Sequence, residues 1–76
     1  MSQRILRARV RHRRKLLGWS QSCLANNASV RRSKISEWES GLVELHQDES
    51  NRVESVISKG LRQKQSELAS EVSITT

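Results

Sequence analysis

The chain has 76 residues, the size of one small domain, and such a domain buries only about 60% of the surface that its unfolded chain exposes. Lys and Arg number 14 against 8 Asp and Glu, so the net charge of +6 favours a polyanionic partner. These values leave no room within the 76 residues for a second core or a large active-site cleft.

Cys23 is the only cysteine, so no disulfide can form within the chain, and we expect a cytoplasmic protein. No apolar run approaches the roughly 20 residues of a membrane span. The basic N-terminal segment has no apolar stretch behind it, so we do not expect a secretory signal. His12 and His46 show no metal-ligand spacing with Cys23, and we expect neither a metal nor another cofactor.

The charge is concentrated in short segments. Residues 1–15 hold seven basic residues and no acid, and residues 31–34 add three more. Residues 37–49 hold five acids and no Lys or Arg. The positive field therefore comes from two short segments that could converge in space.

The whole chain is predicted to be helical. Proline is absent, and no stretch alternates polar and apolar residues with a period of two. In the first helix, Leu6, Val10 and Leu17 share one face, and Gly18 ends the helix. The expected fold class is therefore all-α, a compact domain of four to five helices.

Two short helices follow. Ser20 is predicted to cap a helix over residues 21–27, and a third helix over residues 32–40 is stopped by Gly41. The expected core residues of these helices are Leu24, Ala25, Ala28, Ile35 and Trp38, with Trp19 covering the small core beside Gly18.

The last third of the chain is predicted to form two further helices, over residues 49–59 and 61–71, with a frayed end. We assign residues 1–60 to the folded domain and residues 61–76 to a C-terminal helix or tail with a disordered end. The apolar residues that mark these helices are Val53, Val56, Ile57, Leu61, Leu68 and Val72.

The segment over residues 20–41 has the length and spacing of a helix-turn-helix. Its signature residues are Gln21, Leu24-Ala25, Val30, Ile35-Ser36, Trp38-Glu39 and Gly41. This ungapped pattern resembles the family of phage Cro and repressor proteins, also called the xenobiotic-response-element (XRE) family, and with "VRHRRKLLGW" it covers about 32 of the 76 residues. The resemblance implies a lambda-repressor-like helix-turn-helix domain that binds double-stranded DNA.

In this family the third helix enters the major groove with its N-terminal end toward the bases. The resemblance therefore implies a base-reading role for Arg31, Arg32, Ser33 and Glu37. It implies phosphate contacts for Gln21, Lys34, Ser36 and Ser40, and we add Arg9 and Arg13 of the basic first helix. For each of these residues the alternative is a solvated polar or solubilising side chain.

Arg14 lies on the same stripe as Leu6, Val10 and Leu17, and an unpaired buried charge is very costly. The resemblance pairs this arginine with Glu39. The alternative is that Arg14 extends to solvent along its aliphatic stem.

Two positions depart from the family pattern. The family has glycine where this chain has Ser29, so we expect a differently shaped turn that uses Asn27. The family caps the third helix with Ser or Thr, whereas this chain has Arg31, which cannot accept a hydrogen bond.

The function predicted from these features is transcriptional regulation, by a repressor that binds a near-palindromic operator as a homodimer through residues 42–72. No nucleophile–base arrangement or phosphate-binding glycine loop appears, so we do not expect an enzyme. Three alternatives remain open: an antitoxin-type regulator whose main partner is a protein toxin, an accessory protein in recombination or excision, and a basic amphipathic membrane-surface protein.

Overall fold

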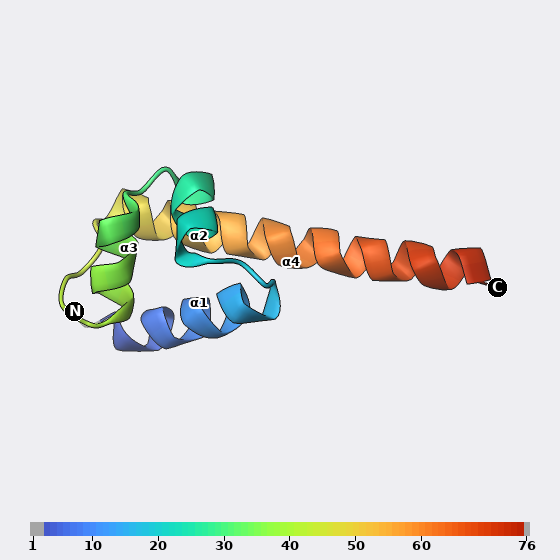
Figure 1. Cartoon of the computed structure of the whole chain (residues 1–76), viewed down its shortest axis with the longest axis horizontal. Coiled ribbons are helices and arrows are strands. Elements are labelled where there is room, and N and C mark those ends of the chain that lie inside the picture. The colour runs from blue at the N-terminus through green and yellow to red at the C-terminus, as the bar shows by residue number, and fades with distance from the viewer. Residues whose placement is uncertain (1–2, 76) are drawn as a thin grey trace.

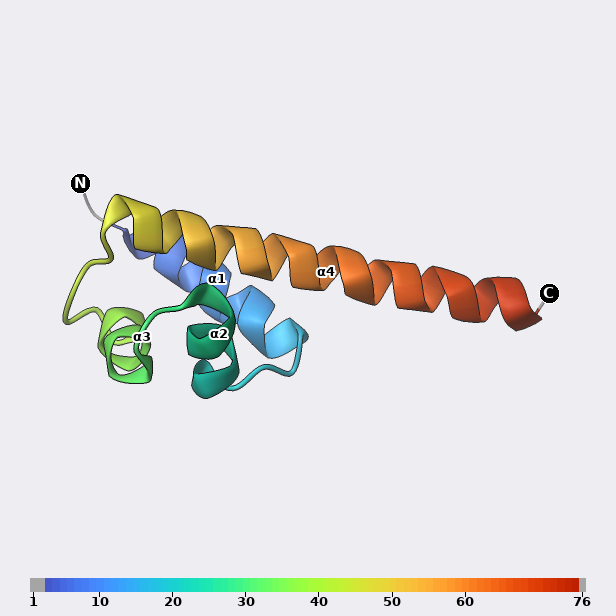
Figure 2. The same ribbon diagram turned by 90° about the horizontal axis from the view of Figure 1, so that it is seen from above.

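The computed structural model describes the backbone of residues 3–75 and the side chains of residues 3–65. It contains four helices and no strand within that part of the chain: α1 (Arg4–Leu16), α2 (Gln21–Ala28), α3 (Arg32–Glu39) and α4 (Gln47–Thr75). Helices α1, α2 and α3 gather around the first half of α4, and the second half extends beyond them (Figures 1 and 2). The all-helical prediction is confirmed.

The break between α1 and α2 follows from Gly18 and Ser20. Gly18 has a φ of 71°, a left-handed conformation that glycine adopts without strain. The Ser20 hydroxyl accepts a hydrogen bond of 3.0 Å from the backbone N–H of Cys23, as expected for an N-cap. Both sequence predictions are confirmed.

The end of α3 is set by Gly41. Its φ is 84°, and the backbone N–H of Leu42 donates to the carbonyl of Glu37 at 2.8 Å. The N–H of Gly41 donates to the carbonyl of Trp38 at 3.0 Å, which completes a Schellman motif. The predicted glycine stop is confirmed.

The core lies where the four helices meet. Its largest fully buried side chain is Trp38, which is surrounded by aliphatic residues from all four helices. The other buried apolar residues are Val10, Leu24, Ala25, Ala28, Val30, Ile35, Leu45, Val53 and Ile57. Leu6, Leu17, Trp19 and Val56 are partly buried against this core.

The prediction of separate fourth and fifth helices is wrong, because α4 runs without interruption from Gln47 to Thr75. Gly60, between the two expected helices, is buried inside α4 rather than ending it. A Cβ at this position would lie 2.9 Å from the Trp19 ring and 3.1 Å from Leu17. Gly60 therefore serves close packing of the α1–α2 loop against α4.

The sequence also predicts a frayed C-terminal end and a dimer surface on the last part of α4. The helical backbone continues to Thr75, and Thr76 lies outside the described residues. The side chains of Leu68 and Val72 also lie outside them, so the role expected for these residues in a dimer stays a prediction.

A basic side chain from another helix lies beside the C-terminal end of each of α1, α2 and α3. Lys64 Nζ donates to the carbonyl of Leu16 at the end of α1, at 2.7 Å. Arg52 Nε donates to the carbonyl of Ala28 at the end of α2, at 2.9 Å. The Arg7 guanidinium lies beside Gly41, after the end of α3. Cations at these ends oppose the partial negative charge of the helix dipoles.

Gln3, just before α1, links the start of that helix to the α3–α4 loop. Its Oε1 accepts hydrogen bonds from the Trp38 indole Nε1 at 2.8 Å and from the Leu45 backbone N–H at 2.9 Å. Its Nε2 donates to the Leu45 carbonyl at 2.9 Å. The indole N–H of the central core residue is thereby satisfied, as a buried polar group requires.

Candidate nucleic-acid interface

A turn of three residues joins α2 to α3, and Ser29 shapes it. Ser29 has φ 56° and ψ 43°, in the left-handed region. The backbone N–H of Val30 donates to the carbonyl of Ala25 at 3.0 Å, so the end of α2 repeats the geometry found at Gly41. The expected turn built on Asn27 is wrong: Asn27 lies within α2, and Ser29 takes the conformation that glycine would take.

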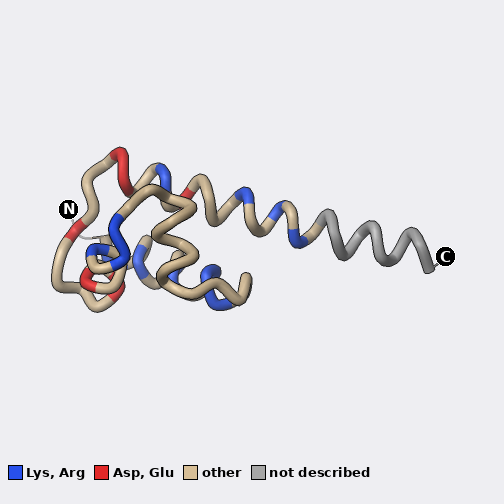
Figure 3. The backbone as a smooth tube through the Cα atoms, turned by 45° about the horizontal axis from the view of Figure 1, so that its top comes forward, with Lys and Arg blue, Asp and Glu red and all other residues tan. Residues whose placement is uncertain are grey.

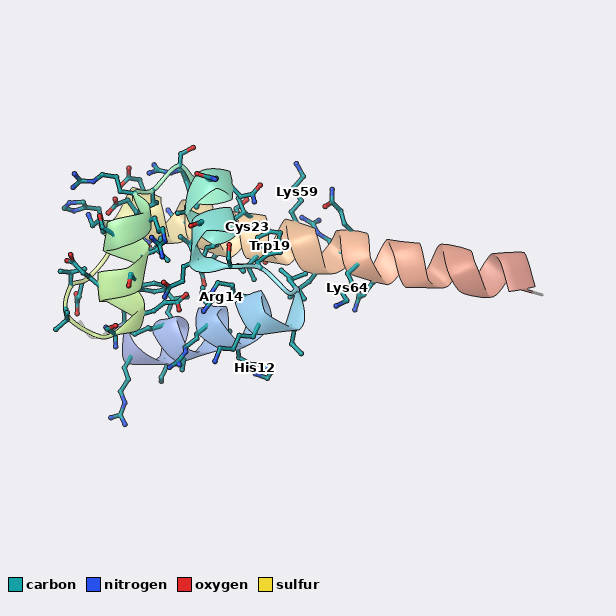
Figure 4. The ribbon with its side chains drawn as sticks, viewed as in Figure 1. His12, Arg14, Trp19, Cys23, Lys59 and Lys64 are labelled. Atoms are coloured by element: carbon teal, nitrogen blue, oxygen red, sulfur yellow. The ribbon has the colours of Figure 1, made fainter. Side chains whose placement is uncertain are left out.

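The end of α3 is held by a buried cluster of polar side chains. Arg14 Nε and Nη2 each donate to one oxygen of Glu39, both at 2.8 Å. The side chains are only 10% and 4% exposed, so Arg14 does not extend to solvent. Arg14 Nη1 also donates to the Trp19 carbonyl at 2.8 Å. Figure 4 shows Arg14 reaching from α1 into the space between the helices.

Gln21 joins the same cluster. Its Nε2 donates to Glu39 Oε1 at 3.2 Å, so the first residue of α2 is tied to the last residue of α3. Glu39 thereby receives three donors, which compensate the cost of burying its charge. The ion pair joins α1 to α3, and the Gln21 hydrogen bond joins α2 to the same carboxylate, so the end of α3 is held beside the first turn of α2.

The outer side of α3 is polar. Arg31, Arg32, Ser33 and Glu37 are all exposed. No ion pair or hydrogen bond engages these four side chains within the described residues, so Glu37 does not hold either arginine in place. Arg31 is the N-cap residue and makes no side-chain cap. The first turn of α3 therefore presents unpaired guanidinium groups to solvent.

Lys34 is engaged elsewhere. Its Nζ lies 2.7 Å from Glu49 Oε1, and that oxygen also accepts from the His46 backbone N–H at 2.9 Å. The ammonium of Lys34 and the His46 N–H hold the pKa of Glu49 below its usual 4.5. The pair ties α3 to the start of α4, and the phosphate contact of Lys34 stays a prediction.

The other expected phosphate-binding residues are spread over the domain. Ser40 is exposed just after α3, and Ser36 is half-buried. Arg9 is exposed and Arg13 is half-buried on α1. Figure 3 shows basic positions along α1 and at the start of α3.

The two basic segments do not merge into one patch at the start of α3. The C-terminal end of α3 lies against α1: its last residue, Glu39, pairs with Arg14, and Gly41, just after the helix, lies beside Arg7. The first half of α3 meets α4 through the Lys34–Glu49 pair. Arg9 and Arg13 therefore lie on the helix that meets the opposite end of α3 from Arg31 and Arg32.

Sequence reasoning did not identify three residues that position α3. They are Gln3, Glu49 and Arg52, whose partners are Trp38, Lys34 and the α2–α3 turn. Glu49 carried a local signal, since it is the third residue of α4 and bonds back to the N–H of the residue before that helix. Gln3 and Arg52 had no local sequence signal, because their partners lie 35 and 23 residues away in the sequence.

Comparisons with protein-family models, curated proteins and solved structures found no match to this chain. In the part of the chain that the structure describes, no helix is long and apolar enough to cross a membrane. Among the same residues, no group of three His, Cys, Asp or Glu side chains is arranged to hold a metal ion.

Proposed function

We propose that the chain is a sequence-specific, double-stranded DNA-binding regulator of transcription. The proposal rests on the first turn of α3. Arg31 and Arg32 are exposed and unpaired there, and no side chain caps the helix. A helix N-terminus carries partial positive charge and disfavours cations. A missing cap costs about 1 kcal/mol as well. An anionic partner bound at this end of α3 accounts for both the cations in the first turn and the missing side-chain cap.

The α2–turn–α3 unit supports a helix-turn-helix reading. Its two eight-residue helices are joined by three residues, and the Arg14–Glu39–Gln21 cluster links the first residue of α2 to the last residue of α3. In this proposal α3 lies in the major groove. Arg32 donates twice to guanine O6 and N7, a contact worth about 1–3 kcal/mol of discrimination.

Neighbouring groups complete the proposed interface. Ser33 is an adaptable donor and acceptor, and Glu37 accepts from cytosine N4. The first turn of α2, beginning at Gln21, offers backbone N–H groups to a phosphate. Arg9 and Arg13 supply affinity that does not depend on sequence.

One recognition helix reads few base pairs, so the proposal includes a two-fold dimer on a near-palindrome with half-sites about one helical turn apart. A shallow hollow lined by Leu16, Leu61, Lys64 and Gln65 supports a dimer surface at the base of the α4 extension. Leu16 is 53% exposed there. In this proposal the regulator acts as a repressor, by occlusion of the promoter.

Fluorescence anisotropy tests this function directly. The probes are the DNA upstream of the chain's own gene and a scrambled duplex of equal length, each at two salt concentrations. We expect affinity for the upstream DNA to be higher by about 10³-fold or more and to persist at the higher salt. Equal affinity for both duplexes that collapses with salt would mean phosphate attraction alone and would end the proposal.

A further inference from the structure

A second surface lies around Trp19, beside the middle of α4. The indole packs on Gly60, and two hollows of about 250 and 270 Å³ open beside it. Trp19, Gly60 and Gln63 line both hollows, so the two form one groove, which we call the Trp19 groove. Figure 4 shows Trp19, Lys59 and Lys64 beside the middle of α4, whereas α3 stands near its start.

The polar groups of the Trp19 groove favour an anion. Lys59 lines one hollow and Lys64 the other, and no Asp or Glu lines either. Lys64 is bonded to the carbonyl of Leu16. Lys59 and Gln63 have no hydrogen-bond or ion-pair partner within the described residues, and neither has the indole N–H of Trp19. An unpaired ammonium and an unpaired indole N–H are both donors without an acceptor.

The shape of the Trp19 groove favours an elongated occupant. Each hollow alone is smaller than a typical small-molecule pocket, and the two share Trp19, Gly60 and Gln63 as lining residues. A peptide strand or helix edge can place one side chain in each hollow. Half-buried tryptophans are also frequent anchors of protein interfaces, because the ring combines a large apolar area with one polar atom.

We propose that the Trp19 groove binds an acidic peptide segment of a partner protein. An apolar side chain of the segment packs against the Trp19 ring. A neighbouring carboxylate accepts hydrogen bonds from the donors of the groove and pairs with Lys59. None of the residues that line the groove belongs to α3, so a bound segment leaves the first turn of α3 free, and this proposal does not rest on the DNA-binding function.

A displayed library of random twelve-residue peptides, selected against the full chain, tests the proposal. We expect the selected peptides to be enriched in Asp or Glu beside an apolar residue. The best peptide and its copy with Gln and Asn in place of Glu and Asp are then compared by anisotropy. The acidic form should bind roughly tenfold more tightly or better, the equivalent of about 1.4 kcal/mol. No acidic enrichment, or equal binding of the two forms, would overturn the proposal.

Matched variants locate the binding. Lys59→Glu should weaken the best peptide at least about tenfold, since it replaces an attraction by a repulsion. Arg62→Glu makes the same charge change on an exposed residue of α4 that does not line the groove, and it should change affinity less than about threefold. The triple variant Arg9→Gln, Arg11→Gln, Lys15→Gln should retain the peptide. Loss of binding in the triple variant but not in Lys59→Glu would place the peptide on α1 and overturn the proposal.

Tryptophan fluorescence gives a second readout. Trp38 is fully buried and Trp19 is half-buried, so acrylamide quenches chiefly Trp19. The bound peptide should protect Trp19 from quenching. Unchanged quenching at saturating peptide would contradict the proposal. So would a Lys59→Glu variant that changes the sedimentation of the chain alone, because the groove would then hold a second copy. Operator binding in the same samples reports on the DNA-binding function separately.

Discussion

The guanidinium of Arg14, on α1, holds the carboxylate of Glu39, the last residue of α3, through two hydrogen bonds of 2.8 Å. Both side chains are buried. Removal of one partner leaves the other as an uncompensated buried charge, which costs more than the pair itself contributes. The pair is thus a requirement for the position of α3 more than a source of net stability.

Arg14→Ala and Glu39→Ala should each lower the free energy of unfolding by about 3–5 kcal/mol. The double variant should lose much less than the sum of the two, because it leaves no unpaired charge. Urea unfolding of all four forms gives the coupling energy. Arg11→Ala, at an exposed site of the same helix, serves as control and should stay within about 0.5 kcal/mol of the parent chain. Negligible coupling would contradict the role of the pair.

Ser29→Gly should stabilise the chain by about 1 kcal/mol, because the left-handed conformation at φ 56° strains an L-residue and not glycine. Gly41 occupies the equivalent place after α3, with φ 84°, so Gly41→Ser should destabilise by a similar amount. The nearest atom to a Cβ at Gly41 is 3.7 Å away, so steric crowding does not confuse the comparison. Thermal unfolding of the two variants measures both changes in stability. If Ser29→Gly and Gly41→Ser change the stability in the same direction, the left-handed conformation does not strain Ser29.

Gly60→Ala should destabilise by about 1–3 kcal/mol, because the new Cβ would lie 2.9 Å from the Trp19 ring. In an exposed helix position the same change would stabilise by roughly 1 kcal/mol. Ser55→Ala, at an exposed site of α4, is a control for introducing alanine without crowding, and it should stabilise slightly. Urea unfolding measures both variants. A stabilised Gly60→Ala would contradict the packing of Trp19 on α4.

Stability should fall in acid partly through Glu49. Lys34 and the His46 N–H lower the pKa of Glu49 in the folded chain below its usual 4.5. The unfolded chain therefore binds the proton more readily, and the stabilisation is present above about pH 4.5 and lost as pH falls through the folded pKa. Unfolding free energies measured between pH 3 and 7 should show a smaller acid loss in Glu49→Gln. NMR titration should show the Glu49 pKa rising in Lys34→Met. An unchanged pKa would contradict the ion pair.

Local signals predicted much of the fold. The helix-ending glycines, the Ser20 cap and the spacing of apolar residues are each set by neighbours within one or two turns. The continuity of α4 was missed because a glycine between two apolar stripes usually marks a break. Only the approach of Trp19, from 41 residues earlier in the sequence, shows why Gly60 is helical.

For the candidate interface, the sequence placed Arg32, Ser33 and Glu37 on the outer side of the third helix and Arg31 just before it. All four side chains are exposed, and their base-reading roles stay predictions. The sequence did not predict the pairing of Lys34 with Glu49, because the loop after α3 brings the start of α4 beside Lys34, and loop paths carry no periodic signal. The phosphate contact of Lys34 stays a prediction.

The most direct test of the proposed reading of DNA by α3 compares Arg32→Gln with Arg9→Gln by anisotropy, on the preferred duplex and a scrambled duplex across a salt series. Arg32→Gln should lose about 1–3 kcal/mol on the preferred duplex and little on the scrambled one. Arg9→Gln should weaken both duplexes equally and reduce the salt slope by about 1. If Arg32→Gln weakens both duplexes equally, α3 does not read bases through Arg32, and the proposed recognition is wrong.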